Sequence, residues 1–85
     1  MMFEVYLSRQ AKKFLEKLDK DTRERIKEKL RLLVDNPFAL PYKKIKGREN
    51  TYGIRVGDYR IIYSVRGYEV RILKIDKRER VYDRL

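Results

Sequence analysis

The stretch that decides the fold is Tyr52-Gly-Ile-Arg-Val-Gly-Asp-Tyr-Arg-Ile-Ile-Tyr-Ser-Val-Arg-Gly-Tyr-Glu-Val-Arg-Ile-Leu-Lys-Ile75. Apolar and polar residues alternate along most of it, a pattern typical of strands that bury one face. Two breaks, Gly57-Asp58 and Arg66-Gly67, each have the length and glycine content of a tight hairpin turn. We therefore predict an antiparallel meander of three strands, at residues 52–56, 59–65 and 68–75.

Two amphipathic helices are predicted before the meander. Ser8 has the chemistry of an N-cap for the first helix. After a tight break at Asp19-Lys20, the capping-box spacing of Asp21 and Glu24 predicts Asp21 as the cap of the second helix. Asn36-Pro37 ends it, because proline disfavours the helical conformation of the preceding residue. The two apolar faces consist of Ala11, Phe14, Leu15 and Leu18, and of Ile26, Leu30 and Leu33.

A short alternating stretch at residues 3–7 adds a strand at the start, so the element order is β-α-α-β-β-β. This order predicts an α+β fold, with residues 1–85 as a single small domain. The sheet is expected to be antiparallel and to pack on the N-terminal helical hairpin. Between the helices and the meander we expect a loop at residues 38–42, followed by the basic run Lys43-Lys44-Ile45-Lys46-Gly47-Arg48.

Composition excludes several classes of site. The chain has no cysteine and no histidine, which rules out disulfides, thiolate or imidazole metal ligands and histidine-based triads. We therefore expect no metal site and no cofactor. The longest apolar runs, Leu32-Leu33-Val34 and Ile61-Ile62-Tyr63, are too short to span a bilayer. No basic leader precedes a long apolar region, so we expect no membrane association and a cytoplasmic protein.

The charge indicates a polyanionic partner. Lys and Arg outnumber Asp and Glu by 23 to 13, which gives a net charge of +10. Residues 1–42 contribute +3 of this and residues 43–85 contribute +7, so the excess lies in the half that contains the meander. Nucleic acid or an acidic protein segment fits such a domain. A generic solubilising surface is the alternative interpretation.

Hairpin length also predicts which residues face each other. Arg55 falls directly opposite Arg60, on the sheet face away from the helices, and like charges so placed repel unless an anion lies between them. Across the second turn we expect Val65 opposite Tyr68, Tyr63 opposite Val70, and Lys74 beside Tyr59. Residues 76–82 should then emerge near the Gly57-Asp58 end. Arginines from three parts of the chain would converge there, unless each guanidinium is solvated or pairs with a carboxylate such as Asp58.

Three strings together resemble the RelE toxins of the RelE/ParE superfamily: Lys44-Ile-Lys-Gly47, Tyr52-Gly-Ile-Arg-Val-Gly-Asp-Tyr-Arg-Ile-Ile-Tyr63 and Lys77-Arg-Glu-Arg-Val-Tyr82. The resemblance covers nearly the whole chain and implies the RelE/ParE-like microbial RNase toxin fold. It also implies a toxin of a type II toxin–antitoxin pair. Such a toxin is a ribosome-dependent mRNA endonuclease, or mRNA interferase, that cuts translated mRNA in the aminoacyl site and inhibits translation. The implied partners are the ribosome, mRNA and a RelB-like antitoxin that neutralises the toxin.

The resemblance assigns roles to individual residues. Arg55, Arg60, Arg78 and Tyr82 match family positions, while Gly53 stands where the bacterial enzyme has a strand lysine. Metal-free cleavage by the RNA 2′-hydroxyl needs a base, cations for the phosphorane and an acid. We expect Arg55 and Arg60 to stabilise the phosphate, Arg78 to act at the leaving group and Tyr82 to stack on a base. Lys46 or Lys44 is the candidate base. Expected RNA contacts are Lys43, Lys44, Arg48, Lys77 and Arg80.

Two other functions fit the same residues. A ParE-like toxin shares the fold and inhibits DNA gyrase without cutting RNA. A basic RNA-binding module would bind transcripts with strong salt dependence and leave them intact.

Overall fold

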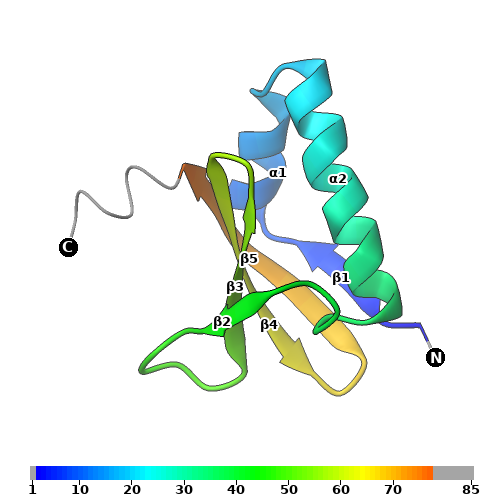
Figure 1. Ribbon diagram of the computed structural model, residues 1–85, viewed down its shortest axis with the longest axis vertical. Coiled ribbons are helices and arrows are strands. Elements are labelled where there is room, and N and C mark those ends of the chain that lie inside the picture. Colours follow the sequence, from blue (N-terminus) through cyan, green and yellow to red (C-terminus); the bar gives the residue numbers. More distant parts are fainter. Residues whose placement is uncertain (1, 78–85) are drawn as a thin grey trace.

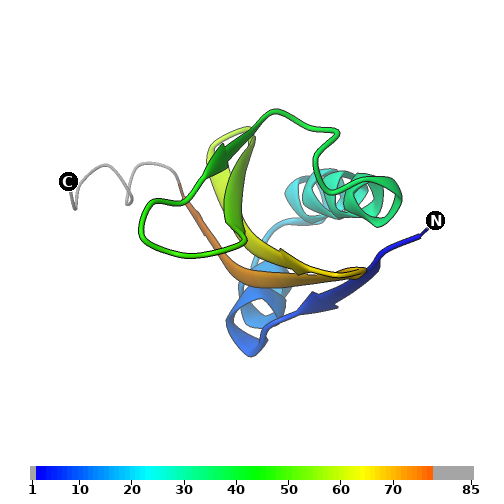
Figure 2. The ribbon, with the colours of Figure 1, turned by 90° about the horizontal axis from the view of Figure 1, so that it is seen from below.

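Five strands and two helices build the molecule, and the computed structural model describes residues 2–77. The sheet order is β1-β5-β4-β3-β2. Helices α1 and α2 pack against one face of this curved sheet (Figure 1), and Figure 2 shows α2 nearly end-on beside it. The strands are β1 (Glu4–Leu7), β2 (Tyr42–Lys44), β3 (Thr51–Val56), β4 (Tyr59–Arg66) and β5 (Glu69–Lys77). The helices are α1 (Arg9–Glu16) and α2 (Lys20–Asp35).

The helix starts follow from side-chain capping. The Ser8 hydroxyl accepts a hydrogen bond from the Ala11 N–H at 3.1 Å, as expected of an N-cap. The prediction of Asp21 as the second cap is wrong, because Asp19 accepts from the Thr22 N–H at 3.2 Å. This hydrogen bond lowers the pKa of Asp19. Asp21 instead lies in the first turn of α2, where a carboxylate faces the positive end of the helix dipole.

The α+β class is confirmed, and two features of the sheet differ from expectation. β1 pairs with β5 in parallel, so the sheet is mixed rather than antiparallel. β2 is an additional strand of three residues in the region predicted to be loop and basic run. Its sequence, Tyr-Lys-Lys, is too short and too polar to show alternation.

Neither helix within the described range is long and apolar enough to cross a membrane.

The register of the second hairpin also differs from the prediction. Val65 faces Val70, rather than Tyr68, because the turn is Gly67–Tyr68 and not Arg66–Gly67. Gly67 has a φ of 58° and Gly57 a φ of 59°, so each glycine occupies the first of its two turn residues. A positive φ at that place favours glycine. The glycine therefore sets where each turn begins.

A β-bulge shifts the alternation of inward and outward residues further along β5. Tyr63 pairs with Ile72, but Ile62 pairs with Lys74, so Leu73 is the extra residue. Unbroken alternation would put Lys74 on the core face; the bulge puts Ile75 there and turns Lys74 outward. The shifted turn moves the pairing by two residues and the bulge by one more, so Lys77, rather than Lys74, lies beside Tyr59.

The first turn of α1 holds β5 just past this bulge. The Ser8 hydroxyl donates to the Leu73 carbonyl at 2.9 Å. The Gln10 amide donates to the Ile75 carbonyl and accepts from the Ile75 N–H, both at 3.1 Å. β1 ends at Leu7, opposite Ile72, so these side chains satisfy backbone groups that β1 no longer reaches.

Tyr63 is the largest side chain of the core, and none of it is exposed. Its hydroxyl donates to the Pro37 carbonyl at 2.7 Å, which ties β4 to the connection after α2. Burial raises the pKa of Tyr63 to about 12. The rest of the core comprises Ala11, Leu15, Ile26, Leu30, Leu33, Ile54, Val56, Ile61, Val70, Ile72 and Ile75.

Replacing Tyr63 tests the value of this buried hydrogen bond. Tyr63→Phe leaves the Pro37 carbonyl without its donor, so we expect unfolding to become easier by about 1–3 kcal/mol. Urea denaturation measures the change. Tyr68→Phe is the control, because Tyr68 is exposed and should shift stability by at most about 0.5 kcal/mol. Equal effects of the two substitutions would contradict the structural role of Tyr63.

The same hydroxyl predicts an alkaline component of stability. The folded protein holds the Tyr63 proton more tightly than the unfolded chain does, because its pKa is raised from 10.0 to about 12. Its contribution is therefore fully present below pH 10 and is lost as the pH rises to about 12, at up to about 1.4 kcal/mol per pH unit. The stability gap between wild type and Tyr63→Phe should shrink over this window in urea titrations. A gap that stays constant would refute the assignment.

Candidate functional site

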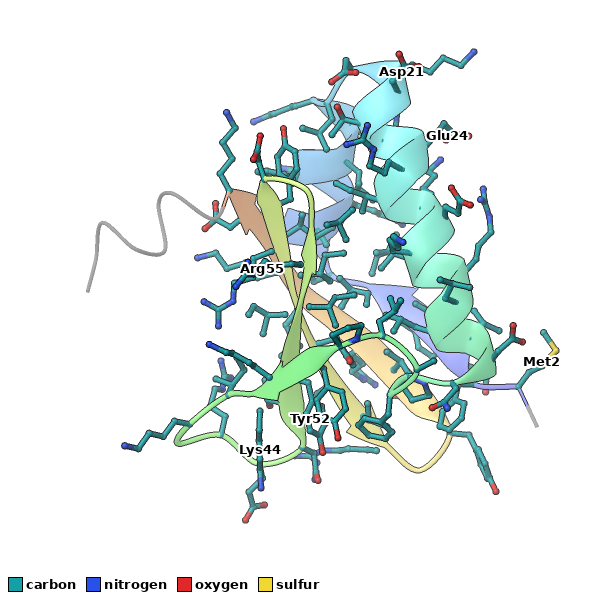
Figure 3. The ribbon with its side chains drawn as sticks, in the orientation of Figure 1. Met2, Asp21, Glu24, Lys44, Tyr52 and Arg55 are labelled. Carbon is teal, nitrogen blue, oxygen red and sulfur yellow. The ribbon has the colours of Figure 1, made fainter. Side chains whose placement is uncertain are left out.

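Charged side chains gather on the sheet face opposite α1 and α2, which we call the outer face. Its register places Arg55 of β3 directly opposite Arg60 of β4, as predicted. Figure 3 shows the Arg55 side chain on the side of the sheet away from α2. Arg55 is exposed and Arg60 is half-buried. Two guanidinium groups therefore project side by side from neighbouring strands.

A carboxylate completes this row. Arg60 faces Asp76 of β5 on its other side, and Lys74 Nζ lies 3.4 Å from Asp76 Oδ2. Lys74 and Asp76 were not predicted on this face, because regular alternation along β5 contains no bulge and would turn both residues inward. One signal was available: without a bulge, Lys74 would point into the core.

Asp58, a predicted alternative partner for the arginines, lies on the other side of the hairpin. It lines a cavity of about 280 Å³ on the helix side of the β3–β4 hairpin, together with Thr22 and Arg25 of α2. Within residues 2–77 the ion pairs are Arg71–Glu69 and Lys74–Asp76. The counter-charge on the Arg55 and Arg60 side of the sheet thus comes from β5.

Gly53 gives Arg60 its room. A Cβ atom at position 53 would lie 3.3 Å from Arg60 Nε, and 3.4 Å from the Cδ1 atoms of Ile45 and Ile62. The side chain of Arg60 therefore passes over Gly53, and the side chains of Ile45 and Ile62 also approach this glycine. Glycine at this position therefore fits the packing of the site. A larger residue, such as lysine, would need these neighbours to move.

The other residues predicted for the site fall into three groups. Lys43 lies opposite Gly53 and so shares the outer face with Arg55. Lys44 pairs with Tyr52 on the helix side, and Lys46 and Arg48 lie on the turn before Thr51, at the end of β3 away from the Gly57–Asp58 hairpin. Figure 3 shows Lys44 and Arg55 well apart.

The end of β5 reaches the Gly57–Asp58 end of the sheet, as predicted. Lys77, the last residue of β5, pairs with Tyr59 next to the Gly57–Asp58 hairpin. Arg78, Arg80 and Tyr82 lie outside the described residues. The structure therefore brings Arg55 and Arg60 together with Lys74 and Asp76, with Lys43 nearby on the same face, and does not bring Lys46 or Arg48 to them.

This arrangement suits phosphate chemistry. Guanidinium groups bind phosphate oxygens through paired N–H donors and stay charged. Lysine ammonium groups add charge, and Asp76 adds an acceptor. Residues 2–77 contain no group of three or more acidic side chains that could hold a metal ion.

Removing one arginine of the pair should stabilise the free protein. Arg55→Gln relieves the repulsion between directly opposed like charges, so we expect a gain of about 0.5 kcal/mol at low salt that fades at high salt. Arg66→Gln is the matched control, since Arg66 faces Glu69 and its loss should lower stability slightly. Urea denaturation at two salt concentrations measures both. Loss of stability in Arg55→Gln at low salt would show that the pair does not repel.

Comparisons with known proteins find toxins that are similar to this chain. A family model described as the ParE toxin of the type II toxin–antitoxin system, parDE, matches residues 5–82. Toxin RelE3 of Methanocaldococcus jannaschii is 35% identical over 66 residues, which cover 68% of this chain and 75% of that protein.

Solved structures are similar over nearly the full chain. The archaeal RelE–RelB complex from Pyrococcus horikoshii OT3 contains a chain with a TM-score of 0.82 and 32% identity, covering 94% of this chain and 99% of the other. The isolated E. coli RelE toxin has a TM-score of 0.78 and 27% identity, covering 96% and 93%. With the family model matching residues 5–82, this chain belongs to the RelE/ParE superfamily of type II toxin–antitoxin toxins and is of the RelE type.

Proposed function

We propose that the protein is a ribosome-dependent mRNA endonuclease that cuts translated mRNA in the aminoacyl site and thereby inhibits translation. The observation that carries this proposal is the Arg55–Arg60 pair, two arginines at directly opposed positions on the outer face of the sheet. Opposed like charges cost stability and are useful where a phosphate lies between them. The RelE-type relatives support the same activity.

The proposed chemistry is metal-independent attack of the RNA 2′-hydroxyl on the adjacent phosphate. Arg55 and Arg60 would stabilise the negative charge that grows on the phosphorane oxygens. The roles proposed for Arg78 at the leaving oxygen and Tyr82 on a base rest on the resemblance to the family. Lys46 and Lys44, the candidate bases, lie toward the far end of β3 and on the helix side respectively. Proposed contacts with the RNA backbone are Lys43, Lys44, Arg48, Lys77 and Arg80.

We also propose that a RelB-like antitoxin neutralises the protein. The similar chains from Pyrococcus horikoshii and Methanococcus jannaschii were both solved in RelE–RelB complexes. A surface with a net charge of +10 favours an acidic partner. Because its substrate complex would be the translating ribosome, we place the protein in the cytoplasm, acting as a single domain.

The alternative is a ParE-like toxin that inhibits DNA gyrase without cutting RNA. The description of the matching family model, a ParE toxin, favours this alternative. The two functions make opposite predictions for mRNA, so one experiment separates them.

Adding the protein to a translating extract tests the proposal. Primer extension should show mRNA cuts in the aminoacyl site, and Arg60→Ala should reduce the cleavage rate by about 10²–10³-fold, as expected when a group that stabilises transition-state charge is removed. Arg66→Ala, in the turn region at the other end of β4, is the matched control and should cut like wild type.

Intact mRNA together with inhibited gyrase would favour the ParE-like function. Intact mRNA that the protein nevertheless binds, with affinity falling steeply as salt rises, would indicate a non-catalytic RNA-binding module.

A further inference from the structure

The outer face carries a carboxylate, that of Asp76, to which the proposed mechanism assigns no role. Asp76 lies directly opposite Arg60 across the β4–β5 ladder, where facing residues are about 5 Å apart. Its side chain is 19% exposed, whereas that of Lys74 is 49% exposed. A carboxylate shielded to this degree beside an arginine is placed for chemistry as well as for charge balance.

Asp76 makes two polar contacts in the described residues and has acceptor capacity left. Lys74 Nζ approaches Oδ2 at 3.4 Å, and the Lys77 N–H donates to Oδ1 at 3.1 Å. A carboxylate can accept about four hydrogen bonds, so both oxygens can still take a proton from a substrate. The Arg60 side chain passes over Gly53, on the β3 side of β4, whereas Asp76 lies across β4 on the β5 side.

The backbone at Asp76 is also held firmly. The preceding residue, Ile75, exchanges two hydrogen bonds with the Gln10 side chain and is fully buried. A group that transfers protons must be positioned within hydrogen-bond reach of its partner. Asp76 lies directly opposite Arg60, whereas Lys46 lies on an exposed turn at the Thr51 end of β3.

We propose that Asp76 is the general base of the cleavage reaction, with Lys74 as the residue that orients it. An Asp76 oxygen takes the proton of the 2′-hydroxyl while the 2′-oxygen forms its bond to phosphorus. The bond from phosphorus to the 5′-oxygen breaks, and the leaving oxygen takes a proton from solvent or from an acid. The products are a 2′,3′-cyclic phosphate and a 5′-hydroxyl, and Asp76 then returns its proton to solvent. This inference rests on the proposed endonuclease function.

Charge balance alone is the competing explanation, and the two make different predictions. If Asp76 only offsets the arginines, its neutralisation should change stability or RNA binding and leave the chemical step nearly intact. If Asp76 is the base, its neutralisation should slow the chemical step while binding stays the same or tightens, because an anion has left a basic surface.

The test measures single-turnover cleavage of mRNA on ribosomes saturated with the protein, and ribosome binding in parallel. Asp76→Asn should lower the cleavage rate by about 10²–10⁴-fold, the usual contribution of a general base, with no loss of binding or of melting temperature. Asp76→Glu keeps a carboxylate and should recover at least about tenfold of that loss.

Glu69→Gln is the matched control. Glu69 is the other outward-facing carboxylate of β5, with its own partner Arg71 at 2.6 Å, and its neutralisation should change the rate by no more than about twofold. Cleavage by Asp76→Asn within about threefold of wild type would overturn the inference and leave the endonuclease function standing. Equal losses in Asp76→Asn and Asp76→Glu with a lowered melting temperature would also overturn it. Absence of cleavage by the wild type would overturn both proposals.

Discussion

Satisfying the backbone of β5 after its bulge is the constraint on which the rest of the structure depends. An extra residue in a sheet leaves peptide groups unpaired, and unpaired buried groups are costly. Here β1 also ends beside the bulge, opposite Ile72, and the side chains of Ser8 and Gln10 pair with the Leu73 and Ile75 backbone groups that β1 no longer reaches. With those groups satisfied, Ile75 can fill the core, and the residues on either side of it can carry charge outward.

The bulge therefore determines both which residues of β5 point into the core and which point to the outer face. The core face needs apolar residues at every inward position, and the bulge supplies Ile75 where unbroken alternation would have supplied a lysine. The outer face gains Lys74 and Asp76 by the same shift. The chemistry proposed for this surface thus depends on a packing requirement on its opposite side.

Much of this could be predicted from the sequence, and each miss has a physical cause. The first hairpin, with Arg55 opposite Arg60, followed from a two-residue turn whose glycine comes first. The second hairpin was misplaced because its glycine was assigned to the second turn position, while Gly67 needs the first. The bulge and the short strand β2 leave almost no local pattern, since both arise from long-range pairing. Of the site, the arginine pair follows from the turn length, whereas the outward position of Asp76 is indicated only by the lysine, Lys74, that unbroken alternation would bury.

The Arg60 side chain lying across Gly53 has a consequence for how this surface can evolve. Ile45, Ile62 and Arg60 all approach the space that a side chain at position 53 would enter. A mutation at that position is therefore not independent of the other three, and its effect depends on which residues are already present. A Cβ atom there would need these neighbours to give by a few tenths of an ångström, so the side chains that position 53 accepts depend on the residues at positions 45, 60 and 62.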